Sequence, residues 1–102
     1  MKEFEIISNG GVMADHIRVP ESYEAAVTEL FDGRVFDMDT PATVIPFIDA
    51  AKEKLQQDPD KYRGLISSSD GIGLRQTRNL LDQMRGLLVM FPDATVSGLV
   101  DP

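Results

Sequence analysis

Residues 3–19 read EFEIISNGGVMADHIRV, and this stretch decides how the chain begins to fold. Two runs rich in apolar residues flank an Asn-Gly-Gly turn at residues 9–11. Asn-Gly is the strongest short-range hairpin signal, because both central residues of the turn take positive φ. We therefore predict a β-hairpin with strands at Glu3–Ser8 and Val12–Val19. Side chains alternate between the two faces of a strand. The face of the second strand that we assign to the core holds Met13, Ile17 and Val19.

Apolar residues at helical spacing predict three helices after the hairpin. They occupy residues 21–31, 41–57 and 74–91. Proline removes an intrahelical hydrogen bond, so Pro46 either kinks the second helix or marks its start. Short apolar runs bounded by Gly, Pro and Asp predict three more strands. These strands occupy residues 34–38, 62–67 and 94–100.

The resulting order is ββαβαβαβ, in which strands alternate with helices after the hairpin. Such alternation favours parallel strands joined by right-handed crossovers. We predict an α/β fold, in which the N-terminal hairpin lies at one edge of a small βαβαβ core with three helices. If all helices lie on one face, the fold is a two-layer α+β one. Because about 100 to 150 residues make one typical domain, residues 1–102 are expected to form a single compact domain.

The charge of the chain is acidic and unevenly distributed. The 102 residues include 17 Asp and Glu against 10 Lys and Arg, which gives a formal net charge of −7. Residues 1–50 carry ten acids and three bases, whereas residues 51–102 carry seven of each. Nucleic-acid backbones are bound by clustered Lys and Arg, so direct nucleic-acid binding is not expected. An acidic surface attracts a basic protein surface instead.

The location of the protein is predicted from what its sequence lacks. The first residues have no apolar signal core, and the longest apolar stretch, Leu87–Phe91, is far shorter than a membrane span. We therefore expect a cytoplasmic protein without membrane association.

Catalytic and metal-binding patterns are also missing from the sequence. The chain has no Cys, and a single histidine, His16, cannot build a two-His metal site. No serine stands in a G-x-S-x-G pattern. Asp37 and Asp39 form an Asp-x-Asp pair, which we interpret as a strand end followed by a helix cap. The sequence therefore predicts no enzyme activity, no metal and no cofactor.

These features together predict a non-catalytic protein-binding module of inhibitor, immunity or regulatory type. It would engage a basic partner surface through its acidic N-terminal half, as acceptors for Arg and Lys. A sharper version is a phage- or mobile-element-type antagonist whose acidic face imitates nucleic-acid phosphates. The free edge of the hairpin could also pair with a partner strand or with a second copy of the chain, as a homodimer. The residues predicted to contact the partner are Asp15, Glu21, Glu24, Asp37 and Asp39.

An alternative function is the binding of a small anion or phosphate ligand by the loop at residues 67–73, SSSDGIG. This loop precedes a predicted helix, whose N-terminal N–H groups can hold an anion. The same loop can instead serve only to cap the helix. The ligand-binding residues in this alternative are Ser68, Ser69, Gly71, Gly73, Arg75 and Arg78.

The third predicted helix also carries a charged ridge, which we interpret as a face turned to solvent. Asp82 lies four residues after Arg78 and three before Arg85, so it can neutralise both locally.

Overall fold

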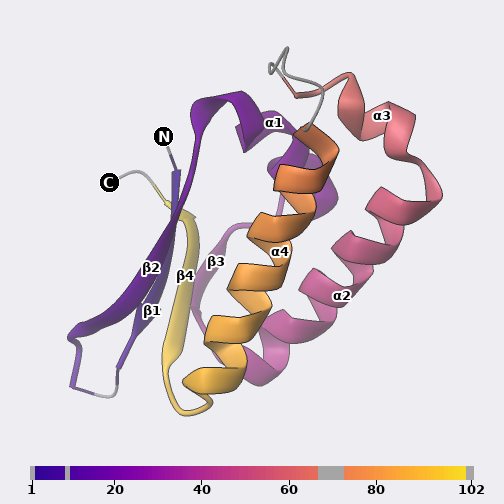
Figure 1. Ribbon diagram of the computed structural model, residues 1–102. Helices are drawn as coiled ribbons and strands as arrows, with labels where there is room; N and C mark the ends of the chain where they lie inside the picture. The colour runs from indigo at the N-terminus through magenta and orange to yellow at the C-terminus, as the bar shows by residue number, and fades with distance from the viewer. Residues whose placement is uncertain (1, 9, 67–72, 101–102) are drawn as a thin grey trace.

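The computed structural model describes residues 2–8, 10–66 and 73–100, which fold into an antiparallel sheet covered by helices (Figure 1). The sheet has four strands in the order β2-β1-β4-β3. In chain order, the elements are β1 (Lys2–Ile7), β2 (Met13–Val19), α1 (Glu21–Leu30), β3 (Phe36–Asp39), α2 (Pro41–Gln57), α3 (Pro59–Arg63), α4 (Gly73–Met90) and β4 (Thr95–Val100).

The predicted hairpin is confirmed. β1 and β2 pair antiparallel, with Phe4 opposite Ile17, and the N–H of Ser8 donates to the carbonyl of Val12 at 2.8 Å. Of the predicted core face of β2, Ile17 and Val19 are buried. Met13 is 48% exposed, so its assignment to the core is wrong. It lies at the end of the hairpin that projects away from the helices, where no layer covers it (Figure 1).

The predicted strand at residues 62–67 is wrong over the part that the structure describes. Pro59 stands in the first turn of the short helix α3, where its missing N–H costs no hydrogen bond. Arg63 and Asp60 form an ion pair of 2.6 Å across this turn. Tyr62 is buried in the core cluster, so the apolar residues taken for a buried strand belong to a helical turn and the segment after it. Ser67 lies outside the described residues.

The parallel βαβαβ core is also wrong, because β4 lies between β1 and β3 and runs antiparallel to both. The 18 residues of α4 span about 27 Å and bring the chain back along the sheet. β4 therefore enters beside the end of β1, where Thr95 pairs with Ile7. Gly98 of β4 is opposite Phe4 on one side and opposite Phe36 on the other.

The fold is a two-layer α+β arrangement, because the helices lie on one face of the sheet and leave the other open (Figure 1). On the open face, Arg18 forms an ion pair of 3.3 Å with Glu3. Between the layers, side chains from every strand and helix form one hydrophobic cluster. Its largest fully buried members are Phe4, Phe31, Phe36, Ile6, Leu30, Ile48, Leu81, Met84 and Leu88.

The start of α2 decides between the two roles predicted for Pro46, a kink within the helix or its first turn. Thr40 caps the helix, since its Oγ1 accepts from the N–H of Thr43 at 3.3 Å, and Pro41 occupies the first turn. Pro46 lies inside α2, so it does not mark the start of the helix. Within the described part of the chain, no helix combines the length and the hydropathy that crossing a membrane requires.

Candidate functional site

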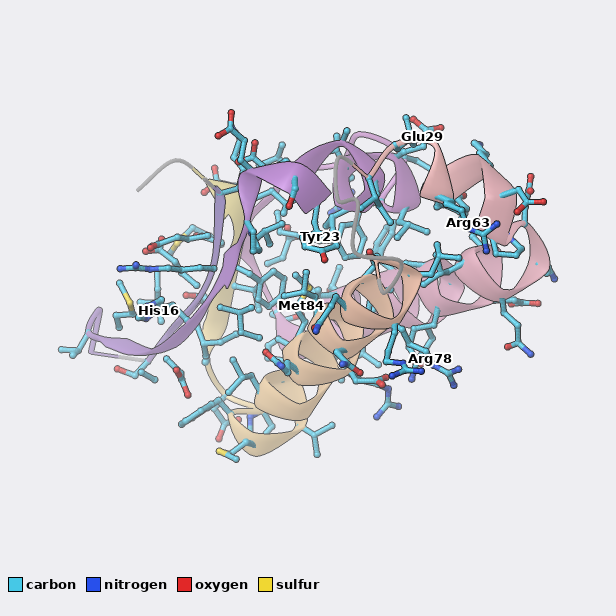
Figure 2. The ribbon with its side chains drawn as sticks, turned by 45° about the horizontal axis from the view of Figure 1, so that its top comes forward. His16, Tyr23, Glu29, Arg63, Arg78 and Met84 are labelled. Carbon is cyan, nitrogen blue, oxygen red and sulfur yellow. The ribbon has the colours of Figure 1, made fainter. Side chains whose placement is uncertain are left out.

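The outer strand β2 offers a long open edge. Six of its seven residues pair with β1 on one side, and no described residue pairs with it on the other. The N–H of His16 donates to Oδ1 of Asp15 at 2.8 Å, which indicates that this N–H points away from β1. His16 lies on the side of the sheet away from the helices (Figure 2). β2 therefore presents main-chain groups that an added strand could bond.

The opposite edge, β3, is closed by its own residues. It has only four residues. Met38 has a φ of 57°, a left-handed backbone conformation that residues other than Gly and Asn rarely adopt. Oδ2 of Asp39 accepts from the N–H of Asp37 at 3.1 Å, and its Oδ1 accepts from Arg34 at 3.3 Å. An edge of only four residues, with irregular pairing and a positive φ at Met38, is a poor template for another strand.

The structure places the five predicted partner-contact residues on two different edges. Asp15 lies on β2, and Glu21 and Glu24 lie in the first turn of α1, which follows β2 directly. Asp37 and Asp39 lie on β3, at the far edge of the sheet. The first three acids therefore lie on β2 and on the helix that follows it, and the last two lie on the other edge strand.

Residues 67–72 of the predicted anion-binding loop, which include Ser68, Ser69 and Gly71, lie outside the described residues. Gly73 is the first residue of α4, and its carbonyl accepts from Oγ1 of Thr77 at 2.8 Å. A Cβ on Gly73 would lie 2.8 Å from Cγ2 of Ile66, so close packing requires glycine there. Within the described residues, glycine at this position therefore has a structural reason.

Arg75 and Arg78 line a hollow of about 510 Å³ on the helical layer. The hollow lies between the C-terminal half of α2, the start of α3 and the first turns of α4. Its apolar lining residues are Leu55, Leu74 and Pro59. We call it the α2–α4 hollow. In Figure 2, Arg78 extends from α4 beside α2.

Asp82 is exposed and the side chain of Arg85 is 42% exposed, in keeping with a solvent-facing ridge, but these two residues pair with α2 and not with each other. Asp82 forms an ion pair of 2.6 Å with Lys52, and Arg85 forms one of 2.9 Å with Asp49. The sequence did contain a signal for these contacts, since α2 and α4 each carry an acid and a base three residues apart. That pattern fits two antiparallel helices, but the prediction considered only pairs within α4.

Within the described ranges, 2–8, 10–66 and 73–100, no group of three His, Asp or Glu side chains is placed to hold a metal ion. In the Asp-x-Asp pair, the main-chain N–H of Asp37 donates to Oδ2 of Asp39.

No model of a known protein family matches the chain, and no curated protein or solved structure is detectably similar to it. The fold defines a structural class, a two-layer α+β protein with one open sheet face. Because a fold does not imply a function, function must be argued from the β2 edge and from the α2–α4 hollow.

Proposed function

We propose that the chain is a non-catalytic protein-binding module, of inhibitor, immunity or regulatory type, that binds a basic partner along β2. The observation that carries this proposal is the seven-residue outer strand, whose outer side no described residue pairs. An added strand gains main-chain hydrogen bonds from such an edge, and its side chains supply the specificity. The edge belongs to the N-terminal half of the chain, which carries the whole acidic excess.

The acidic side chains along this edge supply the preference for a basic partner. At about 3.3 Å per residue, Asp15 lies roughly 13 Å along the strand from Val19, and Glu21 and Glu24 follow in α1. This length fits within an interface of about 800 Å² per partner. Arg and Lys of the partner would pair with these carboxylates and raise the association rate at low salt. In the more specific form of this proposal, the protein is cytoplasmic and its acidic side chains imitate the phosphates of a nucleic acid that the partner binds.

The experiment is an affinity capture from the native host lysate at low and at high salt, with the bound proteins identified. The wild type is compared with a triple reversal of the β2-side acids, Asp15→Lys, Glu21→Lys and Glu24→Lys. A matched control, Asp37→Lys, Asp58→Lys and Asp93→Lys, makes the same change in net charge at exposed sites elsewhere. We expect a basic protein that the wild type and the control capture at low salt and that the β2-side variant loses.

Two results would contradict the proposal. One is equal loss of the partner in both triple variants, because net charge and not the β2 side would then control binding. The other is capture that none of the six reversals changes. Pairing of two copies along β2 is a separate outcome, which sedimentation detects as a mass that rises with protein concentration.

A further inference from the structure

Ion pairs follow the seam between α2 and α4 at regular intervals. Asp49 pairs with Arg85, and one turn further along α2, Lys52 pairs with Asp82. Moving three residues forward along α2 thus moves three residues back along α4, as antiparallel helices require. Figure 1 shows the two helices running side by side in opposite directions.

The next two positions of this series lack an acid on α2. Four residues beyond Lys52 is Gln56, and three residues further is Pro59, at the start of α3. The matching positions on α4 are Arg78 and Arg75. All four residues line the α2–α4 hollow. The series therefore continues into the hollow with two guanidinium groups, and the residues at the matching positions, Gln56 and Pro59, carry no carboxylate.

The pairing state of these two arginines differs from that of the other cations. Seven of the ten Lys and Arg residues form ion pairs within the described part of the chain. Lys2 also has an interaction partner. Arg75 and Arg78 are the remaining two, and neither forms an ion pair with a described residue. The chain has a net charge of −7, and its other Lys and Arg residues have partners, so two arginines without an ion pair are an exception.

Helix stability does not explain the two arginines. Arg75 lies in the first turn of α4, where the positive end of the helix dipole disfavours a cation, and Arg78 follows in the second turn. Residues three apart on a helix face the same side, so the two guanidinium groups also repel each other. The same arrangement favours an anion, because both side chains and the helix end carry the opposite charge.

We propose that the α2–α4 hollow binds a small organic anion whose phosphate or carboxylate group bridges Arg75 and Arg78. The apolar body of the ligand packs on Leu55, Leu74 and Pro59, which line the same hollow. Its volume of about 510 Å³ lies within the usual range of roughly 300–1,000 Å³ for small-molecule sites. This site is on the helical layer and is independent of the proposed contact at β2.

The carboxylates at the edge of the hollow limit the ligand to a compact anion. Asp49 and Glu53 also line it, and Oε1 of Glu53 accepts from Nε2 of Gln57 at 3.1 Å. These carboxylates repel any further negative charge that extends along α2. A ligand with one anionic group satisfies the two arginines, whereas an extended polyanion meets this repulsion.

The test uses phenyl phosphate as the probe, followed by amide chemical shifts of the full chain. Benzoate tests whether a carboxylate can replace the phosphate group. Inorganic phosphate tests whether the ligand needs an apolar body, and phenol tests whether it needs a negative charge. We expect saturable shifts around the hollow with phenyl phosphate or benzoate, and weaker binding of inorganic phosphate and of phenol. Arg75→Gln and Arg78→Gln should each weaken binding about tenfold or more, because each removes a charge-assisted bond.

Arg63→Gln is the matched control, since it removes the same charge from an exposed arginine of α3 that does not line the hollow. Figure 2 shows Arg63 well apart from Arg78. This variant should bind the probe as the wild type does. The proposal would be overturned if neither aromatic anion showed saturable binding up to about 10 mM. That concentration is a hundredfold above a Kd of about 0.1 mM, an ordinary value for a small ligand.

A second variant tests the missing acid directly. Gln56→Glu supplies a carboxylate opposite Arg78, so it should fill the gap in the series and weaken probe binding about tenfold. Gln83→Glu makes the same charge change at an exposed position of α4 outside the lining of the hollow, and should leave binding unchanged. Equal binding by Gln56→Glu and the wild type, or binding of a polyglutamate peptide without binding of the small anions, would overturn the proposal.

Discussion

The two edges of the sheet differ in how they are closed. β2 is seven residues long, and its pairing with β1 is regular from Asp15 to Val19. β3 has four residues, an irregular pairing with β4 and a positive φ at Met38. A carboxylate accepts from one N–H on each edge, Asp39 from Asp37 and Asp15 from His16, so this feature does not separate the two edges. Proteins commonly protect sheet edges with short strands, irregularities and charged side chains. The difference indicates that β3 is protected against pairing, whereas most of β2 is left open to it.

The β3 edge is held by side-chain packing more than by its ladder. Phe36 makes edge-to-face contacts with Phe4, Phe31 and Phe47, at centroid distances of 6.4, 5.3 and 5.7 Å. The guanidinium of Arg34 lies 4.7 Å from the centroid of Phe47 and extends the cluster toward solvent. β3 therefore depends on one aromatic anchor, and β2 on a ladder with β1 that is regular from Asp15 to Val19.

The largest expected effect is the loss of that anchor. Phe36→Ala should lower the free energy of unfolding by about 3–5 kcal/mol, because it empties a fully buried site. Urea unfolding followed by circular dichroism measures the change. Val35→Ala is the control, since Val35 is exposed and should change stability by less than about 0.5 kcal/mol. Similar losses for both variants would contradict the anchored edge.

A smaller loss is expected where the anchor packs on β4. A Cβ on Gly98 would lie 2.7 Å from Cδ2 of Phe36 and 3.1 Å from Cδ2 of Phe4. Gly98→Ala should therefore cost about 1–3 kcal/mol through overpacking. Gly86→Ala in α4 is the matched control, because nothing lies within 4 Å of its Cβ and alanine favours the helix. It should raise stability by up to about 1 kcal/mol, and urea unfolding of both variants measures the two changes. A neutral Gly98→Ala would show that Phe36 moves freely.

The smallest expected effect concerns the strained backbone of β3. Met38→Gly should raise the free energy of unfolding by about 0.5–1 kcal/mol, because glycine takes the φ of 57° without the cost of a side chain. Met38→Val should lower it, since a branched side chain is disfavoured there. Chemical denaturation of the three proteins side by side gives the order. If valine is at least as stable as glycine, the strand does not hold this conformation in solution.

The sequence predicted those elements whose signals are local. The Asn-Gly-Gly segment predicted the hairpin correctly, although of its two glycines only Gly11, with a φ of 78°, takes the positive φ. The helical spacing of Leu81, Met84 and Leu88 is that of the buried face of α4. The segment at Tyr62 was misread because a short apolar run has the same appearance in a strand and in a buried helical turn. That error made the element order look alternating and so led to the parallel sheet.

Long-range arrangements were the part that local patterns could not supply. The insertion of β4 between β1 and β3 depends on pairing between distant segments, which no short motif records. For the same reason, the acids Asp15 and Asp37 were grouped although the fold separates them onto opposite edges. Arg75 and Arg78 were identified from the sequence, but their hollow requires residues of α2 that the prediction did not consider.

The measurement that tests the central claim most directly is capture of the basic partner by His16→Pro, compared with His16→Ala. Proline removes an N–H that bonds the side chain of Asp15 and not the ladder with β1, so the hairpin should still form. Alanine keeps that N–H. Circular dichroism confirms that each variant is folded, and Ala14→Pro, also on the exposed part of β2, replaces the first proline variant if that variant unfolds.

If a partner strand adds to β2, the folded proline variant should lose the partner and His16→Ala should keep it. Capture of the partner by the folded proline variant at the level of His16→Ala would contradict strand addition at this edge.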